Sequence, residues 1–337
     1  MRIGNVDLNT HRFLIAEIGN NHEGDADLAM NMVSTAADSG TDAVKIQAIT
    51  PDRLVNYSQT ERIAQLNGFK LPLSVFQDMA DLAESKGIQF IGTPFDLDSL
   101  DDISPMVSAI KIASSDLNFH PLLAAASSKG KPIILSTGMG TQDEIRSAVD
   151  VIDGNLPNGT SLVDTLVILH CITAYPTPIV EANLHAIKTL SDVFQVTTGY
   201  SDHTLGIEAS VIASTLGARV IEKHFTMDKT RTTFRDHALS ADPQDLERLA
   251  SIMHSLDDVL GTGQKHPMPS ELDNVVAVRR SIVSRKALKK NTVLKIEDLD
   301  FVRPGDGIDP SNSFSVLGRT LNTDLDKHTT LSESHLD

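Results

Sequence analysis

The feature that most constrains the fold is a repeating unit: a short apolar run, a polar turn and a helix-like stretch. Eight such runs occur, at residues 13–16, 43–47, 89–92, 109–112, 132–135, 165–169, 194–198 and 218–221. They are continuously apolar rather than alternating, which is typical of strands buried on both faces of a parallel sheet. Eight units over roughly 250 residues match the size of a (β/α)8 barrel.

A doubly wound open sheet is the alternative fold for such a chain. That fold usually opens with a G-x-G-x-x-G turn, and residues 17–24 do not match this pattern. The expected fold class is therefore α/β, with a TIM barrel followed by a small, mostly β domain.

Changes in composition along the chain indicate the domain boundaries. Residues 1–9 predict a hairpin that turns at Gly4 and Asn5, and the polar stretch 50–68 predicts an active-site loop or lid. We expect the catalytic barrel at 1–262, a linker at 263–280 containing a helix, and a domain of short strands at 281–337. A domain of about 55 residues has a core of marginal stability, so it is expected to pack against the surface of a partner.

Polar side chains lie near or just after the end of every one of the eight apolar runs. They are Glu17, then Lys45 and Gln47, Thr93, Lys111 and Ser114, Ser136 and Thr137, Thr173 and Tyr175, Ser201 and His203, and finally Glu222 and His224. In a barrel the carboxyl ends of all strands meet on one face, where active sites lie. We therefore expect these side chains to surround a single site.

Two histidines follow neighbouring strands and predict a metal site. The helix-like stretch 205–216 separates the two runs, so their strands should lie parallel and adjacent. His203 and His224 would then stand close together as ligands for a divalent metal. The competing interpretation is two unrelated histidines among the 12 in the chain.

Lysines and hydroxyls at the same strand ends predict an anion site. The set suits a phosphate and comprises Lys45, Thr93, Lys111, Ser114 and Ser201. A lysine in a barrel mouth needs an anion, which could instead be Glu17 for Lys45 and Asp116 for Lys111. A Schiff-base aldolase would also use such a lysine, although the histidine pair favours a metal. Glu17 is a candidate general base, and Glu222 is interpreted as a partner of the metal site or, with some preference, as part of a structural ion pair.

Composition disfavours several classes of partner. A formal net charge of −16 argues against nucleic acid and anionic membranes. No apolar run reaches about 18 residues, so no membrane-spanning helix is expected. Cys171 is the single cysteine and is expected to be a small packed residue, in keeping with a reducing cytoplasm.

Several short motifs occur in a characteristic order. They are AEIGNNH at 16–22, AVKIQ at 43–47, TPFD at 93–96, KIAS at 111–114, STGM at 136–139, YPTP at 175–178, GYSDHTLG at 199–206 and EKHFT at 222–226. These motifs strongly resemble the sialic acid synthase family, also called N-acetylneuraminate or nonulosonate synthases. RPGDG at 303–307 resembles the antifreeze-like domain that ends these enzymes, so the likeness covers essentially the whole chain.

The resemblance implies a reaction and the residues that carry it. Phosphoenolpyruvate would condense with the aldehyde of an N-acetylated amino sugar such as N-acetylmannosamine, giving a nine-carbon 2-keto sugar acid and phosphate. His203 and His224 would hold Mn²⁺, with Mg²⁺ or Co²⁺ as alternatives, and Glu17 would be the acid–base group. The implied substrate-binding residues are Lys45, Gln47, Thr93, Lys111, Ser114, Asp116, Thr173, Tyr175, Ser201, Asp236 and Arg303.

The resemblance also implies a domain-swapped homodimer, in which Arg303 of one chain reaches the site of the other. This sequence departs from the family at several positions. Asp116 stands where Glu is usual, Thr173 where Asn is frequent, and residues 233–235 replace the usual turn before Asp236. The retained Asp-His pair at Asp236 favours N-acetylmannosamine-type or legionaminic-type substrates over the pseudaminic type.

Two further functions compete with this interpretation. A related 3-deoxy-ulosonate synthase or metal-dependent aldolase would share the fold, but the former takes a phosphorylated sugar and needs a second cationic cluster. Arg231 and Arg235 are the obvious candidates for that cluster. A non-catalytic ice- or sugar-binding protein would want a flat, regular threonine array, which residues 281–337 lack.

Overall fold

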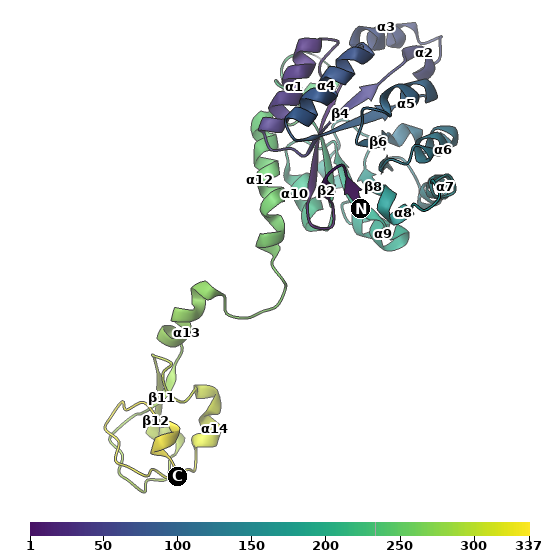
Figure 1. Cartoon of the computed structure of the whole chain (residues 1–337). Helices are drawn as coiled ribbons and strands as arrows, with labels where there is room; N and C mark the ends of the chain where they lie inside the picture. The colour runs from purple at the N-terminus through teal and green to yellow at the C-terminus, as the bar shows by residue number, and fades with distance from the viewer. Residues whose placement is uncertain (233) are drawn as a thin grey trace. The chain divides into compact units, whose positions relative to one another are not determined.

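The computed structural model describes residues 1–232 and 234–337, which form two compact units, Met1–Gly261 and Thr262–Asp337 (Figure 1). Thr233, part of the 233–235 departure, lies outside the described residues.

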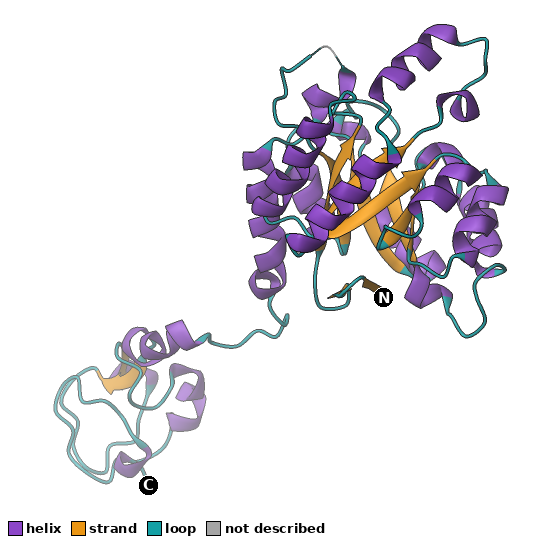
Figure 2. Cartoon of the chain, turned by 45° about the horizontal axis from the view of Figure 1, so that its top comes forward, coloured by secondary structure: helices purple, strands orange, loops and turns teal. Residues whose placement is uncertain are grey.

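The first unit is a closed barrel. Among its described residues, eight parallel strands pair in the order β10-β3-β4-β5-β6-β7-β8-β9, and helices surround them (Figure 2). The strands are β3 (Phe13–Gly19), β4 (Ala43–Ala48), β5 (Gln89–Pro94), β6 (Ala109–Ile112), β7 (Ile133–Ser136), β8 (Leu166–Cys171), β9 (Thr197–Asp202) and β10 (Val220–His224). The predicted (β/α)8 barrel is therefore confirmed.

Helices cover the outside of the barrel. They are α1 (Ala26–Asp38), α2 (Pro51–Leu54), α3 (Thr60–Phe69), α4 (Leu73–Ser85), α5 (Leu97–Ile103), α6 (His120–Ser128), α7 (Gln142–Asp153), α8 (Leu162–Thr165), α9 (Ala186–Phe194), α10 (Glu208–Thr215), α11 (Arg235–Leu239) and α12 (Pro243–Leu260). Local sequence sets several starts: Asp25 caps α1, while Thr141 and Asp242 form capping boxes with the third residues of α7 and α12.

The amino-terminal end of the barrel is filled with apolar side chains. The predicted hairpin is confirmed as β1 (Arg2–Ile3) paired antiparallel with β2 (Val6–Asp7). Its Ile3 shares one buried cluster with Phe13, Ile91 and Val167 at the starts of barrel strands. Because apolar packing occupies this end, the polar strand ends gather at the other, carboxyl end.

Two expectations about local structure are wrong. The run 194–198 is a strand only in part, since β9 begins at Thr197. Phe194 ends α9, and Gln195 adopts a left-handed conformation (φ 54°) that separates the helix from β9. The stretch 50–68, expected as a loop, contains α2 and α3. Leu66 is buried at 2% exposure, and this apolar contact anchors α3 despite the polar composition around it.

The second unit has its own small core. β11 (Ser281–Ser284) pairs antiparallel with β12 (Leu299–Val302), and α13 (Leu272–Val278) and α14 (Ser313–Val316) complete its regular elements among the described residues. A buried cluster that includes Ile282, Leu299 and Leu321 holds it together. In the described part of the chain, no helix combines the length and apolar character needed to cross a membrane.

Candidate active site

A cavity of about 510 Å³ lies at the carboxyl ends of the barrel strands. Most of the predicted site residues line it, namely Glu17, Lys45, Gln47, Thr93, Lys111, Ser114, Thr173, Tyr175, Ser201, His203, His224 and Asp236. Ser136 at the end of β7 and Cys171 at the end of β8 complete the ring, so every barrel strand contributes to the wall. The structure thus brings together side chains that are up to 219 positions apart in the chain.

Two predicted site residues are not part of this wall. Asp116 ends the 3₁₀ turn η1 (Ser114–Asp116), which presents Ser114 and Ser115 to the cavity instead. The Asp116 carboxylate is buried and accepts a hydrogen bond from Ser115 Oγ at 3.2 Å. Arg303 is exposed and follows β12 in the second unit.

Strand register explains why the central groups meet. Glu17 on β3 lies opposite His224 on β10 and opposite Lys45 on β4, so one carboxylate stands between both neighbours. Ser201 on β9 lies opposite Glu222 on β10, which aligns the ends of these two strands. Parallel pairing with this register places their side chains at one height in the barrel mouth.

The two histidines lie side by side, as their matched strand positions predicted. The ring centroids of His203 and His224 are 5.4 Å apart, and the Tyr175 ring lies 4.1 Å from that of His203. His203 Nδ1 lies 2.8 Å from the carbonyl oxygen of Ile172, an arrangement that leaves Nε2 available as a ligand.

The second histidine is also suited to bind a cation. His224 Nδ1 is buried and has no hydrogen-bond partner among the described residues. Burial lowers the pKa of His224 to about 4, so the imidazole is neutral near pH 7, the form that binds metals. The donor pair therefore fits a divalent cation of the kind that accepts imidazole ligands.

The two lysines are neutralised by carboxylates of the cavity. Lys45 Nζ lies 2.6 Å from Glu17 Oε2 and 3.7 Å from Glu222 Oε2, and it donates to Thr93 Oγ1 at 3.1 Å. The alternative pairing of Lys45 with Glu17 is therefore present. Lys111 pairs with Glu222 at 3.8 Å, and no ion pair with Asp116 occurs among the described residues. Glu222 thus belongs to an ion-pair network, the role that the sequence favoured.

The pKa values of the two carboxyl groups are shifted in opposite directions. Burial opposes ionisation of Glu222, but Lys111 and Lys45 outweigh it and lower the Glu222 pKa to about 2. For Glu17, burial outweighs Lys45, and the nearby Glu222 adds to the effect, so its pKa is raised. Glu17 is therefore the carboxyl group of this cluster that most readily exchanges a proton.

The outer part of the wall is built around Tyr175. The guanidinium carbon of Arg235 lies 4.3 Å from the centroid of the Tyr175 ring, and Arg235 Nε donates to Asp236 Oδ1 at 2.9 Å. This group offers a phenol, a carboxylate and a guanidinium to a polar ligand.

Some lining residues were not predicted from the sequence. Asn20 follows β3, Phe95 follows β5, and Arg62 and Gln65 project from α3. The first two follow strands and could have been found by extending the strand-end rule by a few residues. The α3 residues lie in the stretch 50–68 that was expected to form an active-site loop or lid, but nothing in the sequence singles out Arg62 and Gln65 within it.

Comparison with known proteins identifies the group to which this chain belongs. The NeuB family matches residues 32–265, and the SAF domain matches residues 279–337. The chain is 40% identical to N,N'-diacetyllegionaminic acid synthase of Legionella pneumophila, covering 96% of this chain and 94% of the relative. It is 32% identical to pseudaminic acid synthase of Campylobacter jejuni, with 99% of both chains covered.

A solved structure gives the same result. The N-acetylneuraminic (sialic) acid synthetase of Leptospira borgpetersenii serovar Hardjo-bovis is 34% identical and superposes with a TM-score of 0.74, covering 82% of this chain and 94% of that one. The resemblance carried by the sequence motifs is confirmed. The chain belongs to the NeuB family of nonulosonate synthases, and its C-terminal unit carries a SAF, or antifreeze-like, domain.

Proposed function

We propose that this enzyme condenses phosphoenolpyruvate with the open-chain aldehyde of an N-acetylated amino sugar. The products are a nine-carbon 2-keto sugar acid and inorganic phosphate. One observation carries the proposal: two buried lysines, two neighbouring histidines and a carboxyl group of raised pKa line one cavity. The relatives named for legionaminic and pseudaminic acid synthesis support the same reaction class.

We assign the phosphoenolpyruvate end to the two lysines and the hydroxyls around them. The phosphate and carboxylate of this substrate are anions, and Lys45 and Lys111 are the buried ammonium groups of the cavity wall. The hydroxyls of Thr93 and Ser201 already lie within hydrogen-bond distance of this ion-pair network. When the substrate binds, its oxygens would replace part of the contact that the lysines make with Glu17 and Glu222.

We assign a divalent metal, with Mn²⁺ as the first choice, to His203 and His224. When bound, the ion supplies Lewis-acid polarisation of the aldehyde oxygen. The support is the buried His224 Nδ1, which has no hydrogen-bond partner in the described part of the chain, and the orientation of His203 by the Ile172 carbonyl. Calorimetry with a His203→Ala, His224→Ala variant should show loss of Mn²⁺ binding at this site.

Glu17 is proposed as the acid–base group. Carbon 3 of phosphoenolpyruvate attacks the aldehyde carbon, positive charge develops at carbon 2, and water adds there before phosphate leaves by C–O cleavage. In its ionised form, a carboxylate with a raised pKa is a stronger base and can take a proton from that water. The protons of the water end on the former aldehyde oxygen, which becomes a hydroxyl group, and on the phosphate. Gln47 Nε2 donates to Glu17 Oε1 at 2.7 Å and would hold the carboxyl group in position.

The sugar is proposed to bind beside Tyr175, Arg235 and Asp236. The name of the Legionella relative, at 40% identity, specifies a product with two acetyl groups, whereas the pseudaminic relative is 32% identical. The preferred candidate is therefore a hexose with two acetamido groups, with N-acetylmannosamine as the simpler alternative. Arg231 pairs with Glu23 at 3.6 Å, and Arg235 is engaged by Asp236, so neither arginine favours a phosphorylated sugar.

The assembly is proposed to be a domain-swapped homodimer in the cytoplasm. Arg303 is exposed in the small C-terminal unit and is free to act in the cavity of a second chain. Cys171, buried and without a disulfide, suits a reducing compartment.

A phosphate-release assay tests the reaction. Phosphoenolpyruvate and Mn²⁺ are supplied with a diacetamido hexose, with N-acetylmannosamine, or with phosphorylated sugars of four or five carbons. We expect release with the unphosphorylated amino sugars and none in a Glu17→Gln control. Release confined to phosphorylated sugars would favour a 3-deoxy-ulosonate synthase, and no release with any sugar would overturn the proposal.

A further inference from the structure

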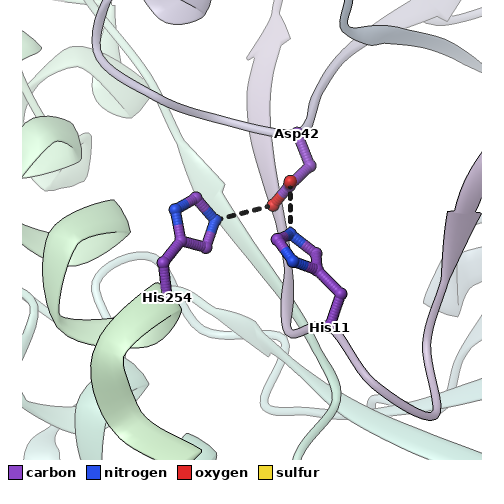
Figure 3. Close-up of side chains that lie close together, drawn as sticks. All are labelled: His11, Asp42 and His254. Atoms are coloured by element: carbon purple, nitrogen blue, oxygen red, sulfur yellow. Dashed lines mark hydrogen bonds and ion pairs between the residues drawn. The ribbon is translucent and has the colours of Figure 1, made fainter. Parts of the chain in front are cut away.

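A second group of metal-ligating side chains lies at the opposite end of the barrel from the cavity. His11 lies in the loop between β2 and β3, Asp42 directly precedes β4, and His254 lies on α12 (Figure 3). His11 and Asp42 therefore sit at the amino ends of neighbouring strands, whereas the cavity lies at the carboxyl ends. The group joins the first strands of the barrel to its last helix.

Both imidazole rings turn a nitrogen toward the same carboxylate. His11 Nε2 lies 2.6 Å from Asp42 Oδ1, and His254 Nε2 lies 3.3 Å from Asp42 Oδ2. The donor atoms of all three residues lie within 4.8 Å of one another. Nothing in the proposed reaction uses these residues.

The geometry is close to that of a tetrahedral zinc site. Zinc takes nitrogen and oxygen ligands at about 2.1 Å, so two ligand atoms stand roughly 3.4 Å apart. The His254–Asp42 pair already has this spacing at 3.3 Å. His11 Nε2 lies 2.6 Å from the other oxygen, Oδ1, so the imidazoles contact different atoms of the carboxylate. Because the three donor atoms lie within 4.8 Å of one another, a shift of roughly 1 Å by His11, a loop residue, would let both rings and one Asp42 oxygen surround a single ion.

Further features meet the requirements for a metal site. Asp42 Oδ2 accepts the backbone N–H of Leu14 at 2.8 Å, which orients the carboxylate from outside the ligand set. The side chains of His11 and His254 are 36% and 35% exposed, and that of Asp42 is 11% exposed. An ion can therefore enter from solvent and keep a water as its fourth ligand.

We propose that His11, Asp42 and His254 form a structural Zn²⁺ site that fastens α12 to the starts of β3 and β4. The ion would take the place of the protons that the imidazoles now share with Asp42. Because β3 pairs with β10, this is the side on which the barrel closes, and the site would strengthen that closure.

The test uses the full-length chain without an affinity tag, in which His203→Ala and His224→Ala remove the cavity pair. Zn²⁺ uptake is measured by competition with a chromophoric chelator. We expect one bound Zn²⁺ per chain. Adding His11→Ala and His254→Gln should weaken this uptake by more than about tenfold, whereas His120→Ala, an exposed histidine on α6, should leave it unchanged.

Absence of Zn²⁺ uptake in the chain with the cavity pair removed, or equal uptake after the His11 and His254 changes, would overturn the proposal. A second measurement covers the case in which the multiple variant does not fold. With Mn²⁺ in excess, Zn²⁺ should raise the melting temperature of the unaltered protein but not of His254→Gln. An equal rise in both proteins counts against the site. Phosphate release by His254→Gln should match that of the unaltered enzyme.

Discussion

At the scale of single residues, Glu222 determines how charge is distributed in the cavity. It lies between Lys45 and Lys111 and accepts a hydrogen bond from Ser201 Oγ at 2.9 Å. All of these groups have low exposure, so each depends on its partners in the cavity wall. The carboxylate therefore compensates the charge of both lysines, which keeps the folded barrel stable before an anionic substrate binds.

Replacing this carboxylate tests that role. Glu222→Gln removes the one ion-pair partner that Lys111 has among the residues the structure describes, so we expect the free energy of unfolding to fall by about 3 to 5 kcal/mol. Phosphate or phosphoenolpyruvate should restore part of the loss by neutralising the lysines. Urea unfolding with and without phosphate measures both effects, with Glu84→Gln on the exposed face of α4 as the control. An unchanged midpoint for Glu222→Gln would contradict the charge network.

Asp116 offers a second prediction, based on pH. Burial raises the pKa of this carboxyl group to about 6, so ionising it costs free energy in the folded state. The cost is absent near pH 4 and complete above pH 7. Asp116→Asn should therefore be more stable than the unaltered protein at neutral pH, by up to about 3 kcal/mol, and nearly equal to it in acid. Thermal unfolding across this range, with Asp143→Asn on exposed α7 as the control, tests the sign.

At the scale of elements, the barrel depends on contacts that join its last helix to its first strands. Arg12 donates to the carbonyl oxygen of Ser214 and pairs with Asp257 on α12 at 2.6 Å. The group of His11, Asp42 and His254 lies on the same side. The contacts of Arg12 and the His254–Asp42 contact link positions more than 200 residues apart, so they contribute to the closure of the barrel rather than to any one element.

The His254–Asp42 contact makes this side of the barrel sensitive to pH when metal is absent. The hydrogen bond with Asp42 raises the pKa of His254. The stabilisation is therefore complete below about pH 6.5, the unfolded value, and is lost as the pH rises through the raised value. His11 faces the same carboxylate and is retained in both proteins compared.

In a chelator, His254→Gln should lower the melting temperature more at mildly acidic pH than at alkaline pH. Differential scanning calorimetry at several pH values measures the difference, and His120→Gln should show none. A melting difference that stays constant with pH would rule out this contribution.

At the scale of the whole molecule, two units with separate cores serve one proposed site. The barrel carries the cavity, and the SAF domain carries Arg303 on an exposed segment. A small domain with its own buried cluster can be presented to a second chain without disturbing the barrel. In the proposed homodimer, the SAF domain of one chain would act at the cavity of the other, while each unit keeps its own core.

Mixed dimers test the proposed exchange. Glu17→Ala alone and Arg303→Ala alone should each be nearly inactive in phosphate release. Chains of the two kinds, unfolded together and refolded, should recover up to about a quarter of normal activity, since half of the dimers are mixed and each has one intact site. Arg319→Ala, a second arginine of the SAF domain, serves as the control. No recovery in dimers shown by mass spectrometry to be mixed would exclude action across chains.

The sequence by itself determined the barrel, the site face and the family. Continuous apolar runs must be buried on both sides, and the polar residues that end them, from Glu17 to His224, then converge on one end of a parallel barrel. Most of the site could be predicted because it obeys this strand-end rule.

Only the tertiary structure decided which groups pair and which residues reach in from elsewhere. It joined Lys111 to Glu222 rather than Asp116, turned Asp116 out of the cavity wall, and placed Arg62 of α3 at the cavity. It also brought His254 to His11 and Asp42. Such contacts depend on side-chain direction and on how helices pack across the closed barrel. Local sequence patterns do not predict side-chain direction or helix packing across the barrel, because residues that are neighbours along the chain do not determine them.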